Sequence, residues 1–100
     1  MELLPEIVNR RSVRSFADRP LDPVALDRII EAGRRAPSAK NRQAWRFIVV
    51  QDEERRKELE DASYGQSYVG EAPAIIAICT TNIDYKMPNG QLAYPIDIGI

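Results

Sequence analysis

The sequence contains no histidine, a single cysteine and no long apolar run, and each shortage excludes a class of protein. Without histidine, neither histidine-dependent catalytic triads nor histidine metal sites can form. Cys79 has no second cysteine with which to make an internal disulfide. No apolar run approaches the roughly 18 residues that a membrane span needs, and the opening MELLPEIVNRR has acids and a proline where a signal peptide carries basic residues. We therefore expect a cytoplasmic protein with no membrane partner and no metal site.

The composition is that of an ordinary globular domain. The 100 residues suit one small domain, with 44% hydrophobic and 29% charged residues. The net charge of −1 argues against a nucleic-acid partner, because general nucleic-acid binders are usually strongly basic. Only two segments have the pattern of a buried strand, and two strands rarely form a stable unit alone. The sequence therefore predicts a fragment of a domain, or a truncated gene product.

Three helices and two strands are expected. We predict helices over Glu2–Asn9, Pro23–Arg35 and Glu53–Ala62, and strands over Arg46–Gln51 and Ala74–Thr80. Asp22 and Asp52 are typical N-caps for the second and third helices. We expect the first strand to be buried on both faces, and Cys79 to be a buried spacer in the second. The predicted core consists of Leu3, Leu4, Ile7, Val8, Leu26, Ile29, Ile30, Trp45, Phe47, Ile48, Val49, Ile75, Ile76 and Ile78. Strands that alternate with helices predict an α+β fold of layered α/β type.

Two stretches carry the residues that could bind a ligand. In APSAKNRQAWRFIVV (36–50), Pro37 ends a helix, and the hydroxyl of Ser38 and the amide of Asn41 can donate hydrogen bonds from the small polar loop that follows. In RRSVRSF (10–16), the side chains of Arg10, Ser12 and Arg14 could converge on one anion, because the planar arginine fork suits phosphate oxygens. From these residues alone, a solvated basic patch is the simpler interpretation of RRSVRSF.

These two stretches, followed by EAPAIIAI (71–78), resemble the nitroreductase family of flavin enzymes, in the family's order along the chain. The resemblance implies a nitroreductase-like fold, a central sheet flanked by helices, with residues 1–100 as the N-terminal part of a single domain. It implies FMN as cofactor, with NADH or NADPH as co-substrate. The matching positions that would bind the flavin are Arg10, Arg11, Ser12, Arg14, Pro37, Ser38, Ala39, Asn41 and, by a looser alignment, Gln66.

In the resembled family the RRS-x-R positions hold the flavin phosphate and ribityl chain, while Pro37–Asn41 would reach the flavin bound mainly by the other subunit. The implied partner is therefore a second copy, in a homodimer with the flavin site across the interface. One position departs from the family pattern: Ala44 stands before the tryptophan where proline is usual. This change frees one backbone angle and removes no ligand contact.

No acid–base pair or nucleophile is recognisable in the sequence, which suits a flavoenzyme, because the cofactor carries the hydride chemistry. The resemblance implies an oxidoreductase that passes electrons from NAD(P)H through FMN to a nitroaromatic, a quinone or a similar small molecule. Two alternatives stay open. One is a flavoenzyme of the same fold that catalyses reductive dehalogenation or flavin fragmentation, and the other is a non-catalytic truncated half-domain.

Overall fold

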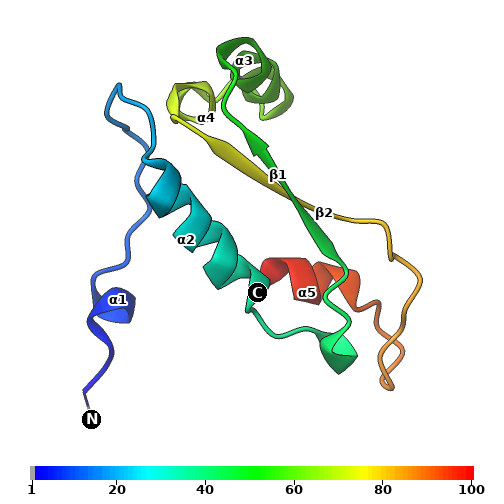
Figure 1. Ribbon diagram of the computed structural model, residues 1–100. Helices are drawn as coiled ribbons and strands as arrows, with labels where there is room; N and C mark the ends of the chain where they lie inside the picture. Colours follow the sequence, from blue (N-terminus) through cyan, green and yellow to red (C-terminus); the bar gives the residue numbers. More distant parts are fainter. Residues whose placement is uncertain (1) are drawn as a thin grey trace.

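The computed structural model describes residues 2–100, with an antiparallel pair of strands at its centre. Strand β1 (Trp45–Val50) pairs with β2 (Ile75–Thr80) in a register that places Trp45 opposite Thr80 and Val50 opposite Ile75. Helix α2 (Pro23–Arg34) runs beside the pair, and α5 (Tyr94–Gly99) lies near the start of β1 (Figure 1). Helices α3 (Glu53–Ala62) and α4 (Ser67–Glu71) pack together at the opposite end of the pair. The structure is thus of the α+β class.

Helices α2 and α3 begin where the sequence predicts, because both have an aspartate N-cap. An Asp22 side-chain oxygen accepts a hydrogen bond from the Val24 amide at 3.0 Å, and the Asp52 side chain accepts one from the Arg55 amide at 3.0 Å. Helix α3 has the predicted bounds, α2 and β2 are each one residue shorter at one end, and β1 begins and ends one residue earlier than predicted. None of the helices that residues 2–100 form is long and apolar enough to cross a membrane.

Arg56 joins the two segments that meet at the α3 end of the strands. Its Nε donates to the Gln51 carbonyl at 3.1 Å, and its Nη1 donates to the carbonyls of Gly70, at 3.2 Å, and Ala72. Gln51 follows β1, whereas Ala72 leads into β2. One guanidinium therefore satisfies three backbone acceptors and fixes α4 relative to the end of β1.

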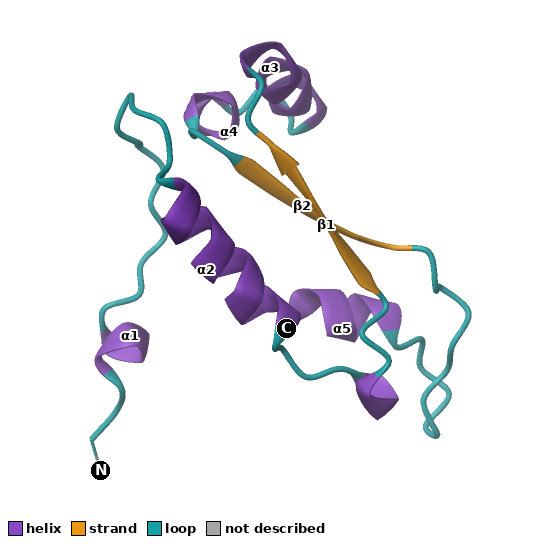
Figure 2. Cartoon of the chain, viewed as in Figure 1, coloured by secondary structure: helices purple, strands orange, loops and turns teal. Residues whose placement is uncertain are grey.

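The first helix is shorter than predicted. Helix α1 covers only Pro5–Val8, although the apolar spacing predicted Glu2–Asn9. The residue before a proline avoids the helical region, so Leu4 is extended (φ −61°, ψ 137°) and forms the N-cap. A long loop separates α1 from α2, and α1 lies away from the strand pair (Figure 2). The predicted burial of its apolar stripe is wrong in this chain, since Ile7 is 61% exposed and Val8 63% exposed.

Within residues 2–100, only one face of the strand pair is covered. Helix α2 lies so close to Phe47 that a Cβ added at Gly33 would be 3.1 Å from the Phe47 ring, and Trp45 beside it is 7% exposed. Side chains alternate between the faces of a strand, so Ile48 points to the other face and is 52% exposed. Cys79 is also exposed. The predicted burial of β1 on both faces and of Cys79 is therefore wrong, because no described element covers this second face.

The predicted core is correct only in part. Among the described residues, only Trp45 and Ala93 are buried hydrophobic side chains, and Ala93 was not predicted. The predicted core residues that are half-buried are Leu26, Ile30, Phe47, Ile75 and Ile76. Those that are exposed instead are Leu3, Leu4, Ile7, Val8, Ile29, Ile48, Val49 and Ile78. The radius of gyration is 16.0 Å, against about 13 Å for a compact domain of this length. An arrangement this open leaves many apolar side chains without neighbours to pack against.

Candidate functional site

The loop between α2 and β1, residues 36–44, has an unusual backbone. It contains a single 3₁₀ turn at Ala39–Asn41, and three non-glycine residues have a positive φ: Lys40 (53°), Asn41 (53°) and Gln43 (52°). Asparagine tolerates this left-handed region, whereas for lysine and glutamine it is uncommon. A residue held in such a region costs on the order of 1–3 kcal/mol and persists only where the surroundings enforce it. This loop therefore needs contacts that hold its shape.

Three hydrogen bonds between a side chain and the backbone hold the loop. The Ser38 hydroxyl oxygen accepts from the Gln43 amide at 3.0 Å and so closes the loop on itself. The Ala39 amide donates to Oδ1 of Asp97, on α5, at 3.0 Å. At the other end, the Thr80 hydroxyl donates to the carbonyl of Ala44 at 2.9 Å. The loop is thus tied to itself, to α5 and to the end of β2.

Two of the predicted site residues in this loop keep hydrogen-bond donors available. Ser38 uses its oxygen as an acceptor, and Asn41 Oδ1 accepts from Nε2 of Gln43 at 3.1 Å. These bonds leave the Ser38 O–H and the Asn41 NH₂ group able to donate to a ligand. Pro37 and Asn41 are exposed, while Ser38 and Ala39 are half-buried. The loop can therefore present a small set of oriented donors.

Two positive charges lie on the outer side of the same loop. The Arg42 guanidinium carbon is 4.4 Å from the ring centroid of Tyr85, and Nζ of Lys40 is 5.5 Å from it. Cations at these distances are attracted by the electron-rich ring face. The Tyr85 ring therefore attracts both cations of the loop to one place.

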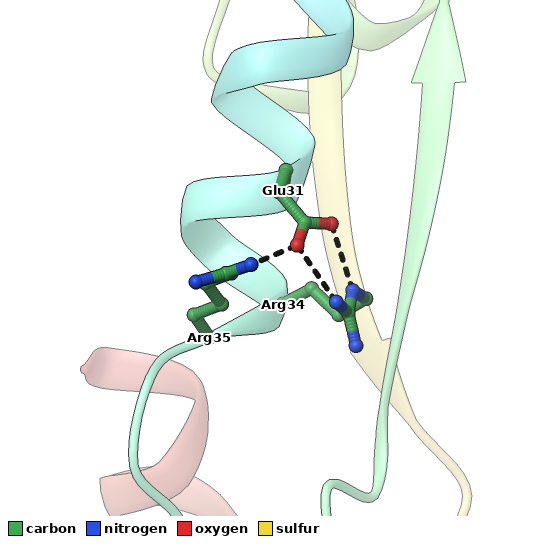
Figure 3. A network of polar contacts seen from close by, with 3 residues as sticks. All are labelled: Glu31, Arg34 and Arg35. Carbon is green, nitrogen blue, oxygen red and sulfur yellow. Dashed lines mark hydrogen bonds and ion pairs between the residues drawn. The ribbon is translucent and has the colours of Figure 1, made fainter.

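The arginines that precede the loop are already paired. Glu31 accepts from Arg34 at 2.8 and 2.7 Å and from Arg35 at 2.9 Å (Figure 3). These hydrogen bonds, first from Arg34 and then from Arg35, lower the pKa of Glu31 to about 2. Because all three side chains are well exposed to solvent, the network is a stabilised helix surface rather than a buried charge site. Glu31 offsets one of the two positive charges, so the network as a whole keeps a net charge of +1.

The second predicted site segment, RRSVRSF, is extended and exposed. Arg10, Arg11, Ser12 and Arg14 make no hydrogen bond or ion pair with any residue among 2–100, and the backbone of residues 10–16 makes none either. The one contact of this segment that involves a charge is Arg14, whose guanidinium carbon is 5.9 Å from the Tyr68 ring centroid. These donors are therefore available to an anion.

Tyr68 connects two of the predicted residues. Its hydroxyl donates to Oε1 of Gln66 at 2.5 Å, while Arg14 lies over its ring. Gln66 is the exposed N-cap residue of α4, and its Nε2 donates to the Ser63 carbonyl at 3.0 Å. Arg14 and Gln66 are 52 positions apart by residue number, yet both contact Tyr68, Arg14 through the ring and Gln66 through the hydroxyl.

The structure does not bring these two groups of predicted residues together within one chain. Helix α4, with Gln66, precedes the start of β2, and the register places that start opposite the end of β1. The loop with Ser38 and Asn41 lies at the start of β1, at the opposite end of the pair (Figure 1). The two groups are therefore separated by the length of a strand.

Three residues that contribute to these sites were not predicted from the sequence. They are Asp97, Thr80 and Tyr68, all of which act through contacts distant in the sequence. The only signal for Asp97 is that it is the one acidic residue in the apolar segment AYPIDIGI. Within residues 2–100, no group of three or more acidic, histidine or cysteine side chains could hold a metal ion.

Comparison with known proteins gives consistent matches over most of the chain. The sequence model of the Nitroreductase family matches residues 7–95. The chain is 38% identical over 78 residues to the FMN reductase (NAD(P)H) of Bacillus subtilis strain 168, a match that covers 78% of this chain and 31% of the relative. The structure of nitroreductase A from Vibrio parahaemolyticus RIMD 2210633 superposes with a TM-score of 0.79 at 29% identity, covering 94% of this chain and 44% of that one.

A further solved structure, the NADPH:FMN oxidoreductase from Vibrio harveyi complexed with NAD+, also gives a TM-score of 0.79 at 29% identity. That match covers 94% of this chain and 45% of the Vibrio harveyi chain. The chain thus spans about a third to a half of the length of these relatives.

Proposed function

Because the chain belongs to the nitroreductase family, we propose that it supplies flavin-binding residues to an FMN-dependent oxidoreductase. The enzyme takes hydride from NADH or NADPH and passes electrons to a nitroaromatic, a quinone or a similar small acceptor. The observation that carries this proposal is the match of the family's sequence pattern over residues 7–95, with relatives named as FMN reductases and nitroreductases. On this proposal, residues 1–100 form the N-terminal part of one domain.

The side-chain donors of residues 10–16, called the arm below, suit the chemistry of FMN. The phosphate of FMN is close to a dianion at neutral pH and has three acceptor oxygens. Arg10 and Arg14 offer planar guanidinium forks and Ser12 offers a hydroxyl, and none of the three side chains makes a hydrogen bond or an ion pair within residues 2–100. We assign these three side chains to the phosphate, with Arg11 beside them. A dianion here would neutralise a cluster of positive charge that the described residues leave unpaired.

The loop and α4 would orient the rest of the cofactor. Ser38 and Asn41 keep free donors that can reach flavin oxygens, and Gln66 offers an amide beside Arg14. When bound, FMN supplies the hydride chemistry itself, so the protein needs no acid or base of its own at the reacting atom. The role of these residues is to bind the cofactor, fix its orientation and limit the access of water to it.

A complete site would require two copies of the chain. Arg14 and Gln66 lie at one end of the strand pair, whereas Ser38 and Asn41 lie at the other, and this separation supports a site that takes the two pairs from different copies. A homodimer in which the arm of one protomer meets the loop of its partner joins the two groups. The open arrangement of the chain, with exposed apolar side chains on α1 and β1, supports such an association.

Complementation tests this dimeric site. In the full-length protein, Arg14→Ala and Asn41→Ala should each weaken FMN binding. A mixed dimer of the two variants has one site with both changes and one site with neither, so it should bind one FMN with wild-type affinity. If mixed dimers bind no better than either parent, the two residues do not act on the same flavin across an interface.

The activity itself is tested on the purified full-length protein. We expect a yellow protein with flavin absorbance, and oxidation of NADH or NADPH that is accelerated by a nitroaromatic or a quinone. A reaction mixture without acceptor and a sample stripped of flavin are the controls. A colourless protein that does not bind added FMN would overturn the proposal.

A further inference from the structure

We propose that Asp97 is a positioning residue, which holds the loop at Ser38–Gln43 in the shape that presents Ser38 and Asn41 to the cofactor. The expected effect of Asp97 on cofactor binding rests on the proposed function. Its role in holding the loop rests on the geometry of the loop alone. No sequence motif assigned a role to Asp97, and its side chain makes no hydrogen bond or ion pair with residues 10–16. Its side chain reaches the loop from α5, 58 residues away in the sequence.

The loop needs such a support because three of its residues have a positive φ, which is uncommon for lysine and glutamine. Lys40, Asn41 and Gln43 all have φ near +53°. The hydrogen bond that the backbone N–H of Gln43 donates to the Ser38 hydroxyl oxygen is local, so it can form in any conformation that keeps these two residues close. This hydrogen bond alone therefore does not fix the orientation of the loop relative to the rest of the molecule. A contact from a separate element is required to fix the loop against the rest of the molecule.

Asp97 provides that contact at the first residue of the 3₁₀ turn. Its Oδ1 accepts the Ala39 amide hydrogen at 3.0 Å in a half-buried position, immediately before the two left-handed residues. Thr80 anchors the loop at its other end, through the Ala44 carbonyl. Between these anchors lie the residues whose φ is positive. Removing the Asp97 acceptor would free the N-terminal part of the turn, which includes Ser38 and Asn41.

The surroundings of Asp97 favour a structural acceptor over a reacting group. With Trp45, Phe47 and Ile98 it lines a cavity of about 190 Å³ between α2, β1 and α5. A carboxylate beside apolar side chains needs a hydrogen-bond donor, and the Ala39 amide is that donor. Since the amide needs only an oxygen acceptor, asparagine should replace aspartate here with little loss. A role that depends on the negative charge would not tolerate this change.

Three variants of the full-length protein test the inference. Asp97→Ala removes the acceptor, Asp97→Asn keeps an oxygen acceptor, and Asp61→Ala removes an exposed acidic residue on α3 that makes no side-chain hydrogen bond among the described residues. The first readout is hydrogen exchange of the Ala39 amide in flavin-free protein. The second is the FMN dissociation constant, measured by quenching of flavin fluorescence.

We expect Asp97→Ala to speed exchange of the Ala39 amide at least tenfold and to weaken FMN binding at least tenfold. Asp97→Asn and Asp61→Ala should stay within about threefold of wild type in both measurements. Unchanged exchange at Ala39 in Asp97→Ala would overturn the inference, and so would an equal loss in the asparagine variant. If wild-type protein binds no FMN, the proposed function fails, whereas exchange at Ala39 still decides whether Asp97 holds the loop.

A second variant keeps the test decisive if Asp97→Ala does not fold. Ala39→Pro removes the amide donor and leaves Asp97 intact. Proline is compatible with this place, because Ala39 is the first residue of the turn and Ser38 before it is extended (φ −144°, ψ 161°). We expect a folded protein whose FMN affinity is at least tenfold weaker. Wild-type affinity in a folded Ala39→Pro protein would show that the bond is not needed.

Discussion

Replacing Arg14 by alanine separates a phosphate ligand from a surface charge. In the structure Arg14 has one interaction, with the Tyr68 ring at 5.9 Å, and no ion pair within residues 2–100. An exposed cation–π contact is worth about 0.5–1 kcal/mol, so the free energy of unfolding without flavin should change by no more than that. A charge-assisted bond to phosphate is worth about 1.5–3 kcal/mol, or roughly a 10- to 150-fold change in FMN affinity. Binding should therefore fall far more than stability.

The assay is fluorescence titration with FMN, together with thermal unfolding of flavin-free protein. Arg19→Ala is the matched control, because Arg19 follows the motif on the same exposed segment and its side chain makes no hydrogen bond or ion pair with residues 2–100. Arg14→Lys keeps the charge but loses the bidentate fork, so its affinity should fall between those of wild type and the alanine variant. Equal FMN affinity in the wild-type, Arg14→Ala and Arg19→Ala proteins would refute the assignment of Arg14 to the phosphate.

Two further predictions follow from interactions of the fold. The pKa of Glu31, lowered to about 2 by Arg34 and Arg35, means that its pairing stabilises the folded chain above its ordinary pKa of 4.5 and is lost as the pH falls towards 2. An NMR titration of the Glu31 carboxyl should show the low midpoint, and Arg34→Gln should raise it; an unchanged midpoint would contradict the pairing. Arg56→Ala leaves three carbonyls without their donor, so we expect it to destabilise the protein by about 1.5–3 kcal/mol in chemical denaturation. A smaller loss than for Arg55→Ala, on the same helix, would contradict this role.

Local chemistry explains which elements could be predicted from the sequence. Asp22 and Asp52 mark helix starts because the capping interaction depends only on neighbouring residues, and the apolar runs identified both strands. The first helix was predicted too long because the apolar spacing of residues 3–8 outweighed the effect of Pro5 on Leu4. Burial was overestimated for a different reason. An apolar side chain in the sequence indicates a surface that can be buried. It does not indicate whether the residues that bury it belong to the same 100 residues.

For the candidate site too, one group of residues could be predicted from the sequence and another could not. The residues with suitable donors, such as Arg14 and Asn41, were named from their chemistry and from the family resemblance. The contacts that hold them were not, because Asp97 and Thr80 meet the loop only after the chain has folded. Tyr68 is similar: nothing local relates it to Arg14, which reaches its ring from a distant segment. The sequence therefore predicted which side chains could bind a ligand, whereas the contacts that support them are visible only in the folded structure.

The backbone of residues 10–16 makes no hydrogen bond within residues 2–100, so this segment can report whether the proposed phosphate site is occupied. A protease must draw an extended stretch of chain into its active site, and this stretch has no hydrogen bond to any of residues 2–100 that would resist it. Trypsin cleaves after arginine, and Arg10, Arg11 and Arg14 all lie there. The groups that would hold a phosphate are thus the same groups that a protease would recognise. If these arginines hold the flavin phosphate, bound FMN should protect this segment from trypsin, and its rate of cleavage should fall as the site fills.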